Sequence, residues 1–416
     1  MPKNLYFVDS IFSPVDAGYS IVSLLSTKAE EQAVVSEFRS DQLKMCNHNG
    51  TIREGWYVYY DVENQVPFGY GNFNYYAIRR FREYYSLREQ LAARQIDYNS
   101  EEANVPQVFL TQQAHITSYH INVGHGNCSI VLLEAGNLYQ LWMVDCSIID
   151  KTDHWRNYQA NVEETFKHIA RKLGKREDEH LFINKFFLTH AHHDHYNGIE
   201  YLVKKHYIDN RTLCYINLYY QMASKTYLRA LNALKDANVR FVEPVVGSSI
   251  KGIRFLHPEC RVYRSKATVK NAGGNYRIVT NPVNDSSSVV MFSLGGHSMV
   301  FTGDLERKGF ENMSKGGTCS RFLFDADYYL VSHHGSINGH PTMPCMNPRR
   351  PMATPLVCAT HNLNKALLMG RNGAYNGLYS PVVTSYWNRT PGDLVLTEVA
   401  PHFVELEWST GTVSFF

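Results

Sequence analysis

The chain has 416 residues, of which 44% are hydrophobic and 19% are charged. This balance excludes the disordered, collagen-like and coiled-coil classes, and at about 150 residues per domain the length predicts two or three domains. The 41 basic and 39 acidic side chains leave a net charge of +2, which is too small to draw the whole molecule to nucleic acid or to an anionic membrane.

The cysteines and the N-terminus bear on where the protein works. Eight cysteines are scattered without a Cys-x-x-Cys pair, which is typical of reduced, buried thiols in an intracellular protein. The first residues, MPKNLYFVDSIF, lack the unbroken apolar stretch of a secretory signal, and no apolar run reaches the roughly 18 residues of a spanning helix. We therefore expect a cytoplasmic protein without a membrane partner.

Residues 1–113 differ in composition from the rest and are expected to form an N-terminal accessory region, whose task the sequence leaves unassigned. Tyr and Phe cluster between Trp56 and Tyr85, and residues 74–94 lack Gly and Pro and carry apolar side chains on one helical face. The other face of that helix carries arginines and could bind nucleic acid, but such a basic face is also typical of an ordinary solvated surface helix. Its arginines are Arg79, Arg80, Arg82, Arg88 and Arg94.

Residues 114–416 are expected to form a second domain of the α/β class. Residues 161–173 predict a helix, the apolar segment 181–188 predicts a strand buried on both faces, and residues 197–205 predict a helix directly after it. Three further segments, separated by Gly- and Asn-containing turns, predict an antiparallel meander: 119–123, 129–133 and 138–144.

The stretch THAHHDHYNG, from Thr189 to Gly198, lies between the buried strand and its helix. It contains the spacing H-x-H-x-D-H, formed by His190, His192, Asp194 and His195. Imidazole nitrogen and carboxylate oxygen suit zinc or a related first-row ion, so the pairs His190/His192 and Asp194/His195 can serve two ions side by side. Without a metal these groups would need other buried partners, so the sequence predicts a metal centre.

Later strand ends supply further candidate ligands. Asp304 follows the apolar strand 298–301, so its carboxylate can bridge two cations, although such a residue can also cap a turn. His333 and His334 follow the apolar strand 328–331 in the same way. One of them should complete the ligands of the second ion while the other faces the substrate. We expect His333 to be the ligand and His334 to be the hydrogen-bond donor or general acid.

Six motifs beside the histidine cluster occur in an order that resembles the metallo-β-lactamase fold hydrolases. The chain is most similar to the hydrolase domain of bacterial DNA-uptake competence proteins and their soluble relatives, some of which are phosphorylcholine esterases or nucleases. The resemblance runs from about residue 118 to the C-terminus. It implies an αββα sandwich, to which the N-terminal region is an addition. The motifs are VGHGNCSIV at Val123–Val131, MVD at Met143–Asp145, FLHP at Phe255–Pro258, NDSSSVV at Asn284–Val290, FTGDLE at Phe301–Glu306 and VSHHGS at Val331–Ser336.

The resemblance also implies roles for residues outside the cluster. Asp145 is expected to accept hydrogen bonds that orient the metal-binding turn, with a solvated carboxylate at a strand end as the alternative. Either His257 or Asn284 could fill the place where many family members have a third histidine for the first ion. His125 stands where the family has Gln, a departure that bears on substrate geometry. The membrane helices of competence proteins are absent, so DNA uptake is not expected.

These observations predict a hydrolase with two divalent ions, zinc being expected and manganese the alternative. Metal-activated water would be the nucleophile, and Asp194 and His334 are the expected catalytic residues. Because the motifs resemble phosphodiester-cleaving branches, we expect a phosphodiesterase or nuclease that acts on nucleic acid or a nucleotide. One alternative is hydrolysis of a lactone, ester or thioester. Another is a non-enzymatic, metal-stabilised binding module that docks a protein partner through residues 1–113.

Overall fold

The computed structural model describes most of the C-terminal three-quarters of the chain and five strands near the N-terminus. All statements below concern the described residues. They are 4–12, 21–26, 36–39, 57–61, 66–69, 83, 86–150, 155–218, 224–244, 246, 249–257, 283–306, 309–311, 313, 326–335, 354–357 and 395–416.

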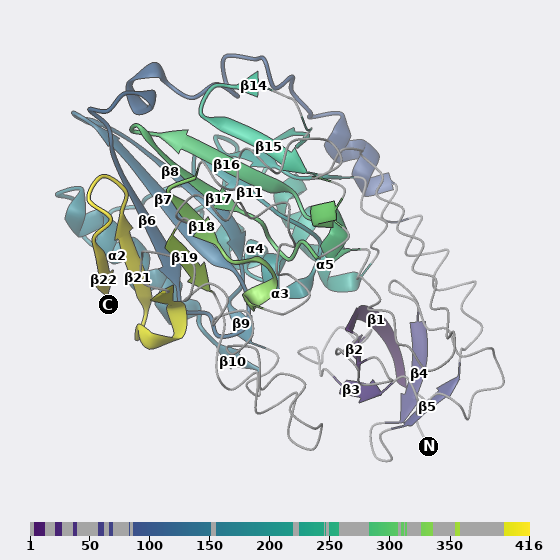
Figure 1. Ribbon diagram of the computed structural model, residues 1–416. Helices are drawn as coiled ribbons and strands as arrows, with labels where there is room; N and C mark the ends of the chain where they lie inside the picture. Colours follow the sequence, from purple (N-terminus) through teal and green to yellow (C-terminus); the bar gives the residue numbers. More distant parts are fainter. Residues whose placement is uncertain are drawn as a thin grey trace.

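A five-stranded antiparallel sheet forms within the N-terminal region (Figure 1). Its strands stand in the order β3-β2-β1-β4-β5, and among the described residues it pairs with no strand of the other sheets. It therefore has its own hydrogen-bond ladder. Its strands are β1 Asn4–Phe12, β2 Ile21–Ser26, β3 Ser36–Arg39, β4 Tyr57–Asp61 and β5 Val66–Gly69.

An eight-stranded sheet has the order β13-β12-β11-β8-β7-β6-β21-β22. The expected antiparallel meander is present as β6, β7 and β8. The strand expected at 181–188 is shorter and lies parallel to both its neighbours, which explains its apolar sequence. The strands are β6 His115–Ile121, β7 Cys128–Ala135, β8 Leu138–Cys146, β11 Lys185–Phe187, β12 Leu213–Tyr215, β13 Arg240–Val242, β21 Phe403–Glu407 and β22 Val413–Phe415.

A seven-stranded sheet has its strands in sequence order, from β14 to β20. The strands from β17 to β20 run parallel to one another, so their carboxyl ends meet at one edge of the sheet. The strands are β14 Ser249–Ile250, β15 Ile253–His257, β16 Val289–Leu294, β17 His297–Phe301, β18 Tyr328–Leu330, β19 Thr354–Val357 and β20 Val395–Leu396.

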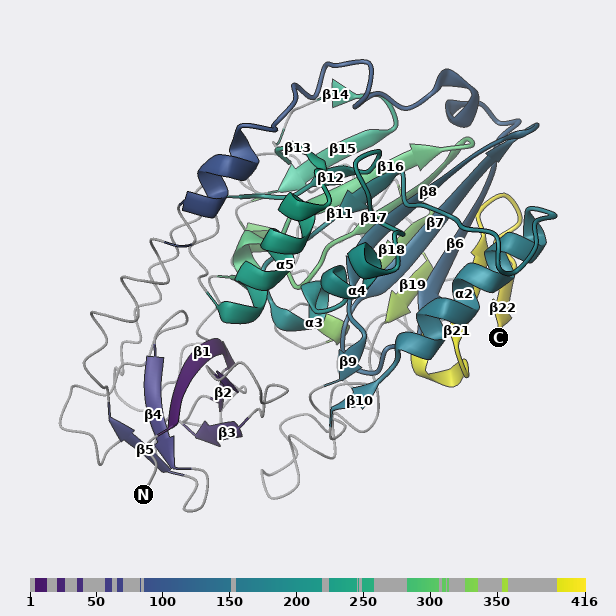
Figure 2. The same ribbon diagram turned by 180° about the vertical axis from the view of Figure 1, so that it is seen from behind.

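The two large sheets pack face to face, and helices cover the outer face of the eight-stranded sheet (Figures 1 and 2). In β7, Ile130 and Leu132 join an apolar cluster with the helices, whereas Val131 and Leu133 join a second cluster with the seven-stranded sheet. This alternation buries both faces of β7. The mixed α/β class expected from the sequence is confirmed. The covering helices are α2 Gln159–Lys172, α4 Ile199–Lys204 and α5 Lys225–Asp236.

None of the described helices combines the length and the apolar character needed to cross a lipid bilayer.

Residues 87–109 pack on the sandwich, although the sequence analysis placed them in the N-terminal region. Leu91 is buried in the cluster beneath the helices, and Phe109 is buried between the two sheets. Arg94 donates a hydrogen bond of 2.6 Å from its guanidinium to the carbonyl of Lys235, so it is partly occupied within the fold. We propose that the boundary between the two units lies between Gly69 and Leu91. Arg79, Arg80 and Arg82 lie outside the described residues.

Lys185 binds this segment to the sandwich through hydrogen bonds. Its position is unusual for a lysine, since it is buried in a strand inside the eight-stranded sheet. Its ammonium donates to the carbonyls of Glu102 and Ala103, at 3.3 and 2.9 Å, and to the hydroxyl of Tyr215 at 3.2 Å. It also lies 5.9 Å from the ring centroid of Trp142. Burial lowers the pKa of Lys185 to about 7.

The lowered pKa predicts a pH dependence of stability. Between about pH 7 and pH 10.5 the native Lys185 is largely neutral while the unfolded side chain stays protonated, so the unfolded state binds more protons and stability rises with pH. Relative to Lys185→Met, we expect the free energy of unfolding to rise by up to about 1.4 kcal/mol per pH unit in this window. Urea unfolding at several pH values measures it. The exposed Lys251→Met is the control, and a Lys185→Met profile parallel to the wild type would contradict the assignment.

Candidate metal centre

The H-x-H-x-D-H residues follow β11: His190 and His192 lie in the turn before the short helix α3, His193–Tyr196, and Asp194 and His195 lie in α3 itself. The turn is held against β8, because the amide of Gly198 donates to the carbonyl of Cys146 at 2.8 Å. Gly198 is required there, since a Cβ atom would lie 2.3 Å from the sulfur of Cys146. The side chain of His195 is fully buried and that of Asp194 is 16% exposed. The local sequence thus presents its donors at one point, beside the strand ends.

Asp145 orients this turn from the end of β8. Its buried carboxylate accepts three hydrogen bonds of 2.7 Å, from the amide of Thr189, the hydroxyl of Thr189 and Nδ1 of His195. Because Nδ1 of His195 donates to a carboxylate, Nε2 is left to face the site. Asp145 itself has a φ of 56°, an uncommon backbone conformation for a residue other than glycine.

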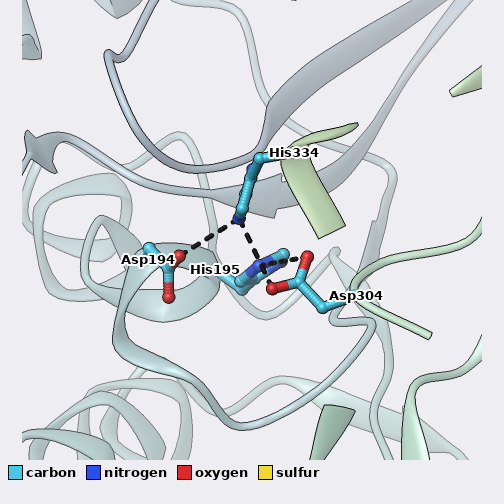
Figure 3. Close-up of side chains that lie close together, drawn as sticks. All are labelled: Asp194, His195, Asp304 and His334. Atoms are coloured by element: carbon cyan, nitrogen blue, oxygen red, sulfur yellow. Dashed lines mark ion pairs between the residues drawn. The ribbon is translucent and has the colours of Figure 1, made fainter. Parts of the chain in front are cut away.

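The turn meets two segments of the seven-stranded sheet, which gives two groups of candidate ligands, the second of which is drawn in Figure 3. His190, His192 and Asp304 form the first group, and within each group the ligand atoms lie within 4.8 Å of one another. Asp304 belongs to both groups, as a bridging carboxylate must. The second group is Asp194, His195, Asp304 and His334.

The spacing in the second group fits a small cation. Nε2 of His195 is 3.1 Å from Oδ1 of Asp304, and Nε2 of His334 is 3.2 Å from Oδ2 of Asp194 and 3.4 Å from Oδ2 of Asp304. Donors around a tetrahedral zinc ion with bonds of about 2.0–2.1 Å are about 3.3 Å apart. Although they are close, the buried Nε2 of His195 and Oδ1 of Asp304 make no well-directed hydrogen bond. A cation between them would satisfy both atoms.

In the second group, two carboxylates and two imidazoles stabilise each other's charged forms. Burial alone would raise the pKa of Asp304, but the imidazoles of His195 and His334 outweigh it and hold that pKa well below its usual value. Burial alone would lower the pKa of His334, but the carboxylates of Asp304 and Asp194 raise it to about 10. The same two opposing causes hold the pKa of Asp194 well below and that of His195 well above their usual values.

The first group is electrostatically different. Burial, reinforced by the neighbouring His195, lowers the pKa of His190 well below its usual value, so this imidazole is neutral. Its Nε2 lies 3.8 Å from Oδ2 of Asp304 and 3.1 Å from Nδ1 of His192. Neutral imidazoles are ready to coordinate a metal without losing a proton.

His334, rather than His333, belongs to a candidate ligand group among the described residues. Both residues have a φ of 50°, so a strained turn separates the directions of their rings. Nδ1 of His333 lies 3.4 Å from Oε1 of Glu306, and its Nε2 lies 3.9 Å from Oδ2 of Asp304. The side chain of His333 is 14% exposed, and burial lowers its pKa to about 4.

Among the described residues, His257 does not join the His190 group. Nδ1 of His257 donates to the carbonyl of Ser287 at 2.8 Å, and burial lowers its pKa to about 4. The amide of Asn284 donates to Oε1 of Glu306 at 3.0 Å. From the sequence, Glu306 was noted only as the last residue of the motif FTGDLE. The structure shows that it lies between Asn284 and His333.

One further residue at the site had no assigned role in the sequence. Nε2 of His125 lies 3.4 Å from Oδ2 of Asp194, and its ring centroid is 4.1 Å from that of His334. Burial, reinforced by the neighbouring His334, lowers the pKa of His125 to about 3. Its replacement of the usual Gln was the only signal in the sequence that could have pointed to it.

No model of a known protein family matches this sequence, and no curated protein matches it. Among solved structures, the chain is similar to the metallo-beta-lactamase fold protein YhfI from Bacillus subtilis, with 14% sequence identity and a TM-score of 0.36. The match covers 70% of this chain and 99% of that protein. Similarity at this level assigns no function.

The raised pKa values predict that metal binding at the second group depends on pH. His334 and His195 must each lose a proton before coordinating a cation, whereas His190 is already neutral. Between about pH 6 and pH 9 we expect zinc affinity at the second group to rise up to about tenfold per pH unit for each proton released, with a flatter profile for the first group. Zinc titration against a chelator at several pH values measures both slopes. Equal slopes would contradict these protonation states.

Proposed function

We propose that the protein is a hydrolase that uses two divalent cations. His190, His192 and Asp304 would hold one cation, and Asp194, His195, Asp304 and His334 would hold the other. The observation that carries the proposal is the sharing of Asp304 between two donor groups. Histidine and carboxylate donors suit zinc, with manganese as the alternative.

Bound cations of this kind supply Lewis acidity and lower the pKa of coordinated water, so that hydroxide is available near neutral pH. The chain's own groups arrange the site for that chemistry. Asp194 and Asp304 provide the negative charge, and Asp145 fixes the ring of His195. The partial exposure of Asp194, unlike the fully buried imidazoles of His195 and His334, supports its place on the substrate side.

We place His333 in the substrate-facing role that the sequence analysis gave to His334. Three observations support this exchange: His333 is partly exposed, it is outside both ligand groups, and Glu306 lies beside its Nδ1. A carboxylate in that place fixes the orientation of the ring, so that the other nitrogen can exchange a hydrogen bond with a substrate oxygen. His334 is then a ligand.

For the substrate we favour a phosphodiester, because the motifs resemble phosphodiester-cleaving enzymes. A nucleic-acid polymer would need a basic surface, and Arg94, one of the five arginines considered for it, donates to a backbone carbonyl. A small phosphodiester, such as one made from nucleotides, fits the near-neutral net charge of +2 at least as well. Lactone, ester and thioester hydrolysis use the same kind of site and are the competing outcome.

Hydrolysis assays separate these substrate classes. With zinc or manganese added, we expect turnover of bis-p-nitrophenyl phosphate to exceed that of a chromogenic lactone and of a thioester by at least about tenfold, a difference of about 1.4 kcal/mol in barrier. Preference for the lactone or thioester would overturn the phosphodiesterase assignment. No turnover of any of the three by protein that holds two ions would favour the binding module.

Substitutions test the ligand assignment. We expect Asp304→Asn to weaken both ions because it removes the shared charge, and His334→Ala to lose one ion. His333→Ala should keep two ions and lower turnover by about 10²–10⁴-fold, the usual contribution of proton transfer or hydrogen bonding at the reacting group. Elemental analysis after dialysis gives the ion count. Loss of an ion from His333→Ala, with retention in His334→Ala, would restore the assignment made from the sequence.

A further inference from the structure

The turn between β6 and β7 is pressed against the metal-binding turn. Gly124 has a φ of 69° and Gly126 a φ of 149°, conformations that favour glycine. A Cβ atom on Gly124 would lie 2.1 Å from Oδ2 of Asp150, and one on Gly126 would lie 2.8 Å from the carbonyl oxygen of Asp194. The two glycines thus let the backbone approach closely on both sides of His125.

Hydrogen bonds fix this turn in place. The amide of His125 donates to Oδ2 of Asp150 at 2.9 Å, and the amide of Asn127 donates to the carbonyl of Asp194 at 3.1 Å. The amide of Ser147 in turn donates to the carbonyl of Asn127 at 2.9 Å. The backbone around His125 is therefore tied both to the strand end after β8 and to the ligand turn itself.

From this fixed backbone, the ring of His125 reaches two candidate ligands that come from different sheets. Its Nε2 lies 3.4 Å from Oδ2 of Asp194, which belongs to the turn after β11. Its ring packs on that of His334, from the turn after β18, with the centroids 4.1 Å apart and the planes inclined by 57°. His125 thus contacts Asp194 and His334, which both belong to the second ligand group.

The direction of the polar contact follows from the chemistry of the partner. An ionised carboxylate only accepts hydrogen bonds, so this contact favours the tautomer of His125 that carries its proton on Nε2. The buried Nδ1 of His125 makes no hydrogen bond with the described residues. Within the described part of the chain, the closest polar contact of the ring is therefore the one that Nε2 makes with Asp194.

We propose that His125 is a positioning residue for the second cation: its Nε2 lies beside Oδ2 of Asp194 and its ring supports that of His334, so that both are held ready to coordinate. This inference rests on the proposed two-cation site. It explains how the Gln of the resembling family can be replaced here, because the side-chain amide of Gln presents an N–H at about the place of a histidine Nε2.

Three substitutions at position 125 test the proposal. His125→Gln keeps an N–H near the place of Nε2, His125→Asn has its N–H near the place of Nδ1 and cannot reach Asp194, and His125→Phe keeps a ring without a donor. We expect the Asn and Phe variants to bind the second zinc ion about 10–100-fold more weakly, as is usual when a partner of a metal ligand is lost. The Gln variant should stay within about threefold of the wild type, and the first ion should be unaffected in all three.

The readouts are zinc titration against a chelator and the visible absorption of the cobalt(II) forms, neither of which needs a substrate. Thermal unfolding of the metal-free proteins checks that they fold alike. If the Phe variant does not fold, the comparison of zinc affinity between the Gln and Asn variants still tests the proposal. Unchanged affinity in the Asn variant, or equal losses in Gln and Asn, would overturn the inference. A wild-type protein that binds fewer than two zinc ions would instead overturn the proposed function.

Discussion

The carboxylate of Asp304 is the group on which the site depends, because it stands at the end of one sheet and faces imidazoles from both. Its side chain is 3% exposed, and an ionised carboxylate in such surroundings is costly unless opposite charges compensate it. His195 from the eight-stranded sheet and His334 from the seven-stranded sheet provide that compensation. The two sheets must therefore keep their relative position for either ligand group to exist.

The contact between the sheets is close at this point. Gly303, with a φ of 53°, precedes Asp304, and a Cβ atom there would lie 2.7 Å from the side chain of Thr189. The amide of Ser288 donates to the carbonyl of Thr189 at 2.7 Å, and the hydroxyl of Ser332 donates to the carbonyl of Leu305 at 2.7 Å. The first bond joins the turn after β11 to the segment before β16, where the hydroxyl of Ser287 accepts from the amide of Asp304 at 3.2 Å. The second joins the turn after β18 to the turn after β17, so the geometry of the candidate site is a property of the sandwich and not of a single loop.

Motif spacing and hydrophobic periodicity predicted those features that depend on residues close together in the sequence. The H-x-H-x-D-H spacing indicated the segment in which four of the candidate ligands lie, and period-two and helical patterns located the meander and α2. The sequence could not decide between His333 and His334, because the two are adjacent and only a turn with positive φ at both determines which ring joins the group around Asp304. Nor could it show that Leu91 and Phe109 belong to the cores of the sandwich, since such packing is set by tertiary contacts that leave no local signal.

The two donor groups differ in what the protein must do to make them functional. The first contains a neutral imidazole, His190, which needs little electrostatic support. In the second group, two carboxylates lie beside two imidazoles whose protons compete with a cation. Neighbouring residues that are not in the group therefore have to hold its side chains in place. Asp145 does so for His195 through a hydrogen bond of 2.7 Å, and His125 contacts Asp194 and His334. In the proposed two-cation site, we therefore expect cation binding at the second group to be the more sensitive to residues that are not themselves ligands.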